Sequence, residues 1–250
     1  MANQQAIQWF SGFFEGEGCF TFRLRNARGN NSGQIIEPKV CLSNTNLRAI
    51  EFSESILNSW LISYSRSVDQ RINKLPCYSI EITKFSEILD FCEHMEPHIQ
   101  CDKFRLKSFK DFCKLRLSKK RYSPYVEEWD IYHKHKNWRA SETTRDGSFN
   151  HSIDWLAGIY EAEGELSRSN RWTNQLNVSI CNTNNLVIEK VIEILKTNLF
   201  NPYISFYKAT EKHQSYWLVS LYGNTKVNRF WSLIESSLVF RKEEWLKIMI

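Results

Sequence analysis

The stretch WFSGFFEGEGCF, residues 9 to 20, returns in outline as WLAGIYEAEGEL at residues 155 to 166. Each copy is an apolar segment that ends in two glutamates separated by one small residue. Apolar residues at helical spacing predict a helix in each copy. A segment repeated within one chain indicates a duplicated unit, so further repetition is expected.

Three more landmarks recur in the same order. The Asn-Thr-Asn of KVCLSNTNL lies at 44 to 46 and that of VSICNTNNL at 182 to 184, an offset of 138. The other two landmarks pair PCYSIEI (76 to 82) with QSYWLVS (214 to 220), and MEPHIQCDK (95 to 103) with IESSLVFRK (234 to 242). The first copy is longer by about eight residues around NARGNNSG. The sequence therefore predicts an N-terminal repeat at 1–120, a linker at 121–151 and a C-terminal repeat at 152–250.

Both repeats show one order of elements. Helices are expected at 5 to 17 and 152 to 163, and the alternation in CFTFRLR and KVCLS predicts two strands. LRAIEFSESILNSWL has helical periodicity, a strand pair follows at about 62 to 83, and FSEILDFCEHM closes the unit as a helix. The order αββαββα, found twice, predicts an α+β fold of two pseudo-symmetric repeats. Each repeat would be a four-stranded antiparallel sheet with helices on one face, joined at the first helices.

Small residues mark one face of each opening helix. Gly12 and Gly16 are four residues apart, and Gly158 and Ala162 occupy the matching places. We expect the two helices to pack closely around a pseudo-twofold axis and to end together. Two carboxylates would then meet at electronegative helix ends, where each raises the proton affinity of the other. A divalent cation such as Mg²⁺, held by carboxylate and carbonyl oxygens, removes both problems.

The composition sets broad limits on partner and compartment. The net charge of +5 and the 33 Lys and Arg residues permit a nucleic-acid partner without requiring one. Seven cysteines without a CxxC pair favour reduced thiols inside a cell. No stretch approaches the roughly 18 apolar residues of a membrane span, so no membrane partner is expected.

The paired motifs resemble a known family. FSGFFEGEG and LAGIYEAEG resemble the LAGLIDADG motif, and the second copy matches its first three letters. With the duplication covering nearly the whole chain, the sequence is similar to single-chain, two-repeat LAGLIDADG homing endonucleases. The resemblance implies a monomeric, intron-encoded enzyme that makes a metal-dependent double-strand break with short 3′ overhangs at a long asymmetric DNA target. It implies an intracellular location: a mitochondrion or chloroplast if an organelle genome encodes the protein, and otherwise the cytoplasm or nucleoid.

The resemblance also implies roles for single residues. Glu17 and Glu163 stand at the motif position that binds the catalytic metals, and the carbonyls of Gly16 and Ala162 stand where further ligands are supplied. Mg²⁺ is the expected cofactor, Mn²⁺ a substitute, and Ca²⁺ a cation that binds without supporting cleavage. Lys103 and Lys242 are candidate basic catalytic partners, with Lys107 and Arg241 as competing choices. Glu15 and Glu161 are expected to be solvated or helix-capping acids.

Double-stranded DNA should lie on the polar sheet faces, where side chains can reach base edges and phosphates. The expected contacts in the first repeat are Thr21, Arg23, Arg25, Lys39, Cys41, Ser43, Ser79 and Glu81. Those in the second repeat are Glu165, Ser167, Ser169, Arg171, Asn177, Ser179 and Cys181. Arg168 falls where Phe22 stands in the first copy, so that strand is expected to be short or shifted in register. Because Trp217 and Val219 are both apolar, the sequence does not decide which face of the last strand is the core face.

Two alternatives keep the same scaffold. An intron RNA maturase could use the basic stretch at 103 to 121, expected to be an amphipathic helix, to hold RNA. A catalytically inactive DNA-binding protein would keep the sheets but not the chemistry, and the intact motif acids argue against it. A glycosidase-like pair of carboxylates does not suit the context, because the polar faces are basic and no sugar cleft is indicated.

Overall fold

The computed structural model describes residues 3–26, 34–70, 72, 74–119, 126–138, 150–169, 175–211 and 214–249. The chain forms two compact units, one of Gly18–Arg139 and one of Asn3–Glu17 with Ala140–Ile250. The opening helix α1 (Gln4–Glu17) therefore packs with the second half of the chain. The boundaries at 120 and 152 stay a prediction from the repeat.

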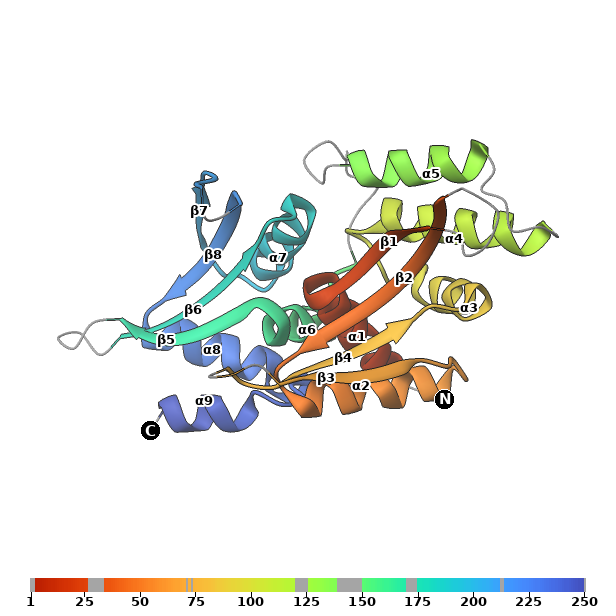
Figure 1. Cartoon of the computed structure of the whole chain (residues 1–250). Coiled ribbons are helices and arrows are strands. Elements are labelled where there is room, and N and C mark those ends of the chain that lie inside the picture. Colours follow the sequence, from red (N-terminus) through yellow and green to blue (C-terminus); the bar gives the residue numbers. More distant parts are fainter. Residues whose placement is uncertain are drawn as a thin grey trace. The chain divides into compact units, whose positions relative to one another are not determined.

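The first unit is built on a four-stranded antiparallel sheet in the order β1-β2-β4-β3 (Figure 1). Its strands are β1 (Gly18–Asn26), β2 (Gln34–Asn44), β3 (Ser65–Asp69) and β4 (Cys77–Ile82). Its helices are α2 (Leu47–Ser59), α3 (Phe85–Met95), α4 (Lys103–Ser118) and α5 (Val126–Asn137). Alternate residues Val40, Leu42, Ile80 and Ile82 are buried, which confirms the predicted pattern of one core face and one open face. NARGNNSG lies for the most part outside the described residues.

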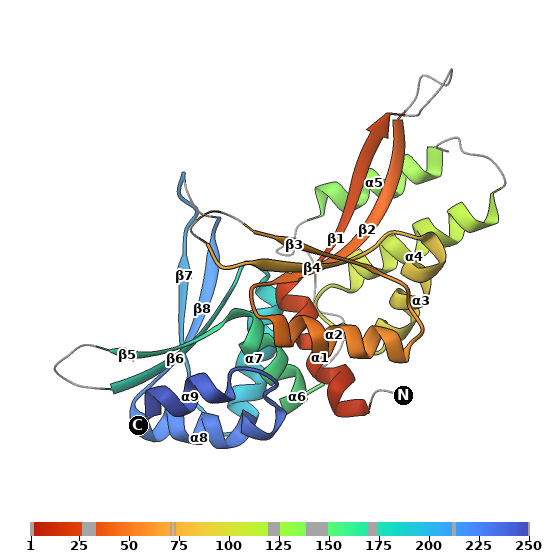
Figure 2. The same ribbon diagram turned by 60° about the horizontal axis from the view of Figure 1, so that its bottom comes forward.

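The second unit repeats this sheet in the order β5-β6-β8-β7 (Figure 2). The strands are β5 (Gly164–Ser169), β6 (Gln175–Asn182), β7 (Tyr203–Tyr207) and β8 (Tyr216–Tyr222). The helices are α1, α6 (Ile153–Glu163), α7 (Asn185–Thr197), α8 (Asn224–Ile234) and α9 (Lys242–Met249), with the short 3₁₀ helix η2 (Glu235–Ser237). The predicted α+β architecture of two pseudo-symmetric repeats is confirmed.

The repeated Asn-Thr-Asn turns each central strand into the following helix. The Oδ1 of Asn44 accepts the backbone N–H of Asn46 at 2.7 Å, and Asn46 then caps α2 by accepting the N–H of Arg48 at 3.0 Å. In the second unit, Asn182 and Asn184 make the same two contacts at 2.7 and 3.0 Å. Asparagine suits both places because its short side chain can bind nearby backbone N–H groups.

The register in the second sheet settles the two open strand assignments. Arg168 pairs with Leu176 without a slip, and its guanidinium binds the carbonyl of Ile248 in α9, so the expected shift of register is wrong. Both β1 and β5 run up to the limit of the described residues, so the expectation that β5 is short stays a prediction. In β8, Val219 and Leu221 are buried and therefore face the core.

Part of the predicted linker is a docked helix. α5 lies against α4 and β2, and a cluster of Ile36, Phe112 and Tyr132 joins them. His135 forms a 3.1 Å hydrogen bond with the Phe20 carbonyl, and burial lowers its pKa to about 4, so its neutral ring donates through Nε2. Among the described residues, no helix has the length and apolar character needed to cross a membrane.

Candidate metal and nucleic-acid site

The backbones of α1 and α6 touch through glycines. A methyl group added at Gly12 would lie 2.1 Å from the carbonyl oxygen of Trp155, and one at Gly158 would lie 2.0 Å from that of Trp9. Neither oxygen can move away, because both belong to helical backbone. The close approach predicted from the small residues is therefore confirmed, and only glycine fits at these two crossing points.

A reciprocal pair of hydrogen bonds fixes the two helices in register. The indole Nε1 of Trp9 donates to Glu161 at 2.6 Å, and that of Trp155 donates to Glu15 at 2.7 Å. Both carboxyl groups are buried, so the expectation that these acids are solvated is wrong. The sequence signal was present, because a tryptophan stands six residues before the first acid in both copies.

Glu161 also holds the segment that leads into α9. Its carboxylate accepts the backbone N–H groups of Val239, Phe240 and Arg241 at 2.7 to 3.0 Å. These residues precede the first turn of α9, so the acid holds the connecting segment and the helix-capping role expected from the sequence stays a prediction. Burial raises the pKa of Glu161, while these N–H groups oppose the rise by favouring the carboxylate. One buried acid thereby places Arg241 relative to the end of α6.

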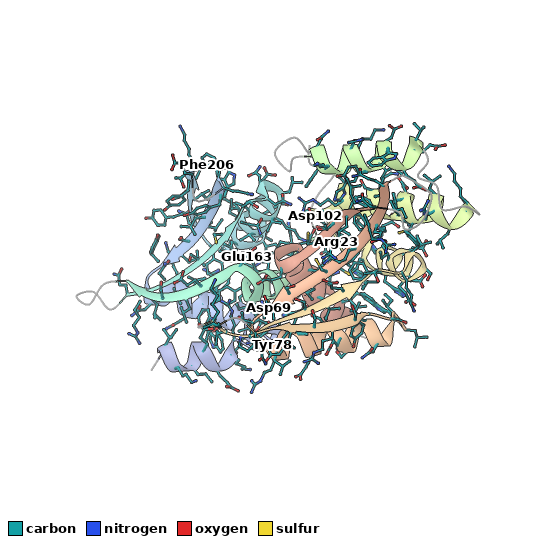
Figure 3. The ribbon with its side chains drawn as sticks, viewed as in Figure 1. Arg23, Asp69, Tyr78, Asp102, Glu163 and Phe206 are labelled. Atoms are coloured by element: carbon teal, nitrogen blue, oxygen red, sulfur yellow. The ribbon has the colours of Figure 1, made fainter. Side chains whose placement is uncertain are left out.

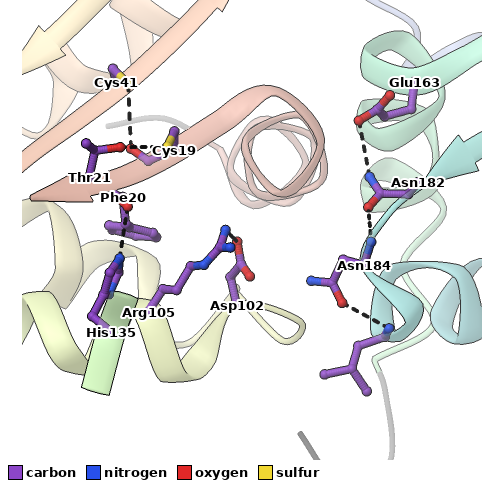
Figure 4. Close-up of polar contacts among 11 residues, drawn as sticks. Cys19, Phe20, Thr21, Cys41, Asp102, Arg105, His135, Glu163, Asn182 and Asn184 are labelled. Carbon is purple, nitrogen blue, oxygen red and sulfur yellow. Dashed lines mark hydrogen bonds and ion pairs between the residues drawn. The ribbon is translucent and has the colours of Figure 1, made fainter. Parts of the chain in front are cut away.

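The last turns of the helices bring Glu17 and Glu163 to one end of the pair. A methyl group at Gly16 would lie 2.5 Å from the Cβ of Ala162 and 3.1 Å from the Cγ of Glu163. Burial, together with the negative charge of Glu17, raises the pKa of Glu163 to about 7. The amide of Asn182 donates to the Glu163 carboxyl at 3.1 Å (Figure 4), which holds this side chain in one orientation.

This arrangement suits a divalent cation. Two acids share one end of the helix pair, and burial first and the charge of Glu17 second raise the pKa of Glu163. A bound cation would offset both effects, because it favours the charged form of the carboxyl group. Within the described ranges, no three His, Cys, Asp or Glu residues gather as a side-chain metal site. A cation here would therefore use the two glutamates with backbone carbonyls or water, the oxygen ligands that Mg²⁺ accepts. The carbonyls of Gly16 and Ala162 stay predictions.

The basic group beside Glu163 is Arg241. Its guanidinium binds the carbonyl oxygen of Gly164, and its charge opposes the rise in the pKa of Glu163. Lys242, the predicted partner, is an exposed residue that begins α9, and Lys103 is an exposed residue that begins α4. The sequence analysis named Arg241 as the alternative to Lys242 for the basic catalytic residue. What pointed to it in the sequence was its position next to Lys242, which recurs in the first repeat as Lys103.

Comparisons with known proteins bear on the fold that carries this site. No family model matches the sequence, and no curated protein matches it. Solved structures do match. The chain superposes on the homing endonuclease I-LtrWI bound to target DNA with a TM-score of 0.74 and 13% identity, covering 98% of this chain and 89% of that one. The protein has the LAGLIDADG homing endonuclease fold.

Two further structures extend the likeness to this LAGLIDADG fold. I-SmaMI bound to cleaved DNA gives a TM-score of 0.70 at 15% identity, covering all of this chain and 88% of that one. I-GzeII in complex with its DNA target gives 0.70 at 12% identity, covering 97% and 88%. Another I-SmaMI structure holds uncleaved DNA in the presence of calcium ions.

The open face of the first LAGLIDADG sheet carries the predicted polar residues. Lys39 is nearly buried and pairs with Glu81 at 2.6 Å, while the hydroxyls of Ser43 and Ser79 are 2.7 Å apart. Arg23 is exposed on β1 (Figure 3). Thr21 and Arg25 share this face, and Arg25 forms an ion pair with Glu37 at 2.8 Å. Arg23, Arg25, Lys39 and Lys84 all line one surface pocket.

Two cysteines stand opposite each other on the same face. Cys19 and Cys41 are partners in the β1–β2 register, and the Cys41 thiol lies 3.8 Å from the Cys19 carbonyl oxygen (Figure 4). All seven cysteines are free thiols, as the sequence predicts. Only Cys41 was named from the sequence as a DNA contact, although the alternation in β1 places Cys19 on the same face.

The open face of the second LAGLIDADG sheet carries Glu165, Ser167, Asn177, Ser179 and Cys181. Ser179 is nearly buried, and the others are exposed or half-buried. Ser169 pairs with Gln175 at the end of β5, and Arg171 lies outside the described residues. Sequence reasoning missed the tyrosines of β7 and β8 on this face, whose signal was the alternation in YISFY and in YWLVSLY.

Proposed function

We propose that this protein is a divalent-metal-dependent endonuclease that makes a double-strand break, with short 3′ overhangs, at a long asymmetric DNA site. One observation carries the proposal: the interlocked α1 and α6 bring Glu17 and Glu163 to the same end of the helix pair. The fold likeness to LAGLIDADG structures that hold target DNA supports it.

Each residue of the site has a definite task in this proposal. Glu17 and Glu163 hold Mg²⁺, with Mn²⁺ as a substitute, and Asn182 keeps the Glu163 carboxylate in its binding orientation. When bound, the cation activates water and stabilises the leaving 3′ oxygen. Arg241 supplies a fixed positive charge beside Glu163, suited to the added negative charge of the reacting phosphate.

The competing functions have less support. A catalytically inactive binder would not need two acids placed together where they repel, because that arrangement costs stability without a cation. No observation on the described residues favours the intron RNA maturase, so that alternative stays a prediction from the sequence. Monomeric state, intron origin and organelle location are likewise carried forward as proposals from the resemblance.

The first experiment is a cleavage selection. Purified protein is mixed with a randomised duplex library in Mg²⁺, in Ca²⁺ and in EDTA, and the broken ends are sequenced. Breaks at one long asymmetric site in Mg²⁺ alone, with 3′ overhangs, are the expected result. Specific retention of DNA without breaks in Mg²⁺ would contradict the nuclease. A protein that neither breaks nor retains DNA would contradict DNA recognition as well.

The site assignment is tested with Glu17→Gln and Glu163→Gln on the selected target. Each change removes a negative ligand but keeps the side-chain shape, so double-strand cleavage should fall at least about a thousandfold while DNA affinity in Ca²⁺-free buffer stays within about threefold. Glu51→Gln, on the exposed face of α2, is the matched control and should cleave normally. Near-normal cleavage by either site variant would remove that glutamate from the metal site.

A further inference from the structure

The two sheets have the same pairing of strands, but the side chains on β3 and β4 differ in chemistry from those on β7 and β8. The register matches Ser65 with Tyr203 and Asp69 with Tyr207, because Ser65 pairs with Glu81 as Tyr203 pairs with Ser220. The open-face positions of the first pair of strands are Ser65, Ser67, Asp69, Cys77, Ser79 and Glu81. Those of the second pair are Tyr203, Ser205, Tyr207, Tyr216, Leu218, Ser220 and Tyr222. The second set contains no charged side chain.

Four of these residues, Tyr203, Tyr207, Tyr216 and Tyr222, form what we call the tyrosine face. Tyr216 and Tyr222 lie on the open side because Val219 and Leu221, which alternate with them in β8, are buried in the core. Tyr203 and Tyr207 of β7 share that side because they pair with Ser220 and Tyr216 of β8. Tyr203, Tyr207 and Tyr222 keep 62%, 44% and 43% of their surface exposed. A cluster of exposed aromatic rings on one sheet face is a feature of binding surfaces.

The rings are held before any partner arrives. Tyr207 stacks on Tyr216 with centroids 4.8 Å apart and planes 12° apart, and Tyr203 meets Tyr222 edge-on at 5.4 Å. Each pair joins neighbouring strands, so the rings lose little further freedom on binding. Lys226 lies 5.9 Å from the centre of the Tyr203 ring, and Lys208 directly follows β7, which places positive charge at the margin.

We propose that the tyrosine face reads the 5-methyl groups of thymines in the major groove of one half of the DNA target. The inference rests on the proposed function and adds to it the base preference of the second half-site. Thymine carries the only methyl group on the major-groove edge of the four ordinary bases, and apolar contact is how proteins recognise it. Uncharged rings in the centre with lysines at the margin match methyl groups between two rows of phosphates.

The first sheet cannot make this contact in the same place. Asp69 and Glu81 occupy the positions of Tyr207 and Ser220, and a carboxylate there favours cytosine amino groups over methyl groups. The same two ladders therefore predict different base preferences for the two half-sites. This difference provides an internal control within one protein.

The test uses deoxyuridine, which lacks the thymine methyl group but keeps every hydrogen-bonding atom. In the target found by the cleavage selection, all thymines of one half-site are replaced by deoxyuridine, and a second DNA carries the same replacement in the other half-site. The Kd of wild-type protein for each DNA is measured by fluorescence anisotropy. We expect about a threefold loss of affinity for each contacted methyl group, confined to one half-site. The same replacement in the other half-site should leave Kd unchanged.

Tyr207→Ser and Tyr207→Phe connect that loss to the tyrosine face. Tyr207→Ser should weaken binding to DNA that contains thymine and should not weaken it further when uracil replaces the thymine that Tyr207 contacts. Tyr207→Phe should keep the preference for thymine over uracil. Cys77→Ser, at the position of Tyr216 in the first sheet, is the matched control. Circular dichroism checks that each variant is folded, and the wild-type measurement needs no variant.

Three results would overturn the inference. They are an unchanged Kd with uracil in either half-site, equal losses in both half-sites, and a uracil effect that is undiminished in Tyr207→Ser. Any of these with intact cleavage would leave the proposed nuclease standing. Absence of specific DNA binding by the wild-type protein would instead overturn the proposed function itself.

Discussion

A proton and a metal ion compete for Glu163 near neutral pH. Its pKa of about 7 means that the group is half protonated at neutral pH, because burial and Glu17 disfavour its negative charge. We expect Mg²⁺ affinity to fall about tenfold per pH unit below pH 7 and to level off above it. Isothermal titration calorimetry in buffers of different ionisation heat measures both the affinity and the released proton.

The same group sets the sign of a stability change in the absence of metal. A folded-state pKa above the ordinary value of 4.5 stabilises the protein fully below pH 4.5, and that contribution is lost as the pH rises through about 7. Glu163→Gln should remove both pH dependences. A Mg²⁺ affinity in the wild type that stays flat from pH 5.5 to 8 would contradict the assignment.

Arg241 and Lys242 are adjacent, and Arg241 is the residue whose charge acts on the pKa of Glu163. The charge of Arg241 lowers the pKa of Glu163, so Arg241→Ala should move the pH midpoint of cleavage upward and reduce the rate about tenfold or more. Lys242→Ala, at an exposed position of α9, should leave the pH midpoint in place and change the cleavage rate by no more than about twofold. Rate profiles from pH 5.5 to 9 with saturating DNA distinguish the two, and a larger effect at Lys242 would reverse their roles.

The α1–α6 pair depends on backbone contact at the element scale. Gly158→Ala would place a methyl group 2.0 Å from the Trp9 carbonyl oxygen and 2.8 Å from the Phe13 nitrogen, so the helices would have to separate. Overpacking of this kind costs about 1 to 3 kcal/mol, which lowers Tm by several degrees in a chain of this size. Separation would also move Glu163 away from Glu17, so the cleavage rate should fall by more than the loss of folded protein explains.

Ser11→Ala is the control for that prediction. Ser11 is buried in α1, the partner of the helix that carries Gly158, and in the described contacts it hydrogen-bonds only to the Gln8 carbonyl of its own turn. The change therefore adds no atom to the interface. Differential scanning calorimetry compares the two variants. Equal Tm values for Gly158→Ala and the wild type would show that the helices can part without loss.

The whole molecule carries two sheets with separate open faces, so base recognition should be separable by half-site. Arg23→Ala should weaken discrimination at positions in one half-site by about 1 to 3 kcal/mol and leave the other unchanged. Ser167→Ala, on the second sheet, should act only on the opposite half-site. Binding to a panel of single-base target variants measures both, and a uniform loss across the target would contradict separate reading by the two sheets.

The sequence by itself determined the duplication, the element order and the pair of motif acids. These features depend on local properties: helical or alternating periodicity, small residues four apart, and an Asn-Thr-Asn that turns a strand into a helix. The alternation in each strand also placed most polar residues on the correct face. Such patterns are carried by neighbours in the chain, so they can be read without coordinates.

Only the tertiary structure decided which of the similar residues do which work. It buried Glu15 and Glu161 against tryptophans of the opposite helix and chose Arg241 over Lys242 as the neighbour of Glu163. It also docked α5, from within the expected linker, on the first unit. These outcomes depend on contacts between residues far apart in sequence, where burial and charge are set by packing and not by local pattern.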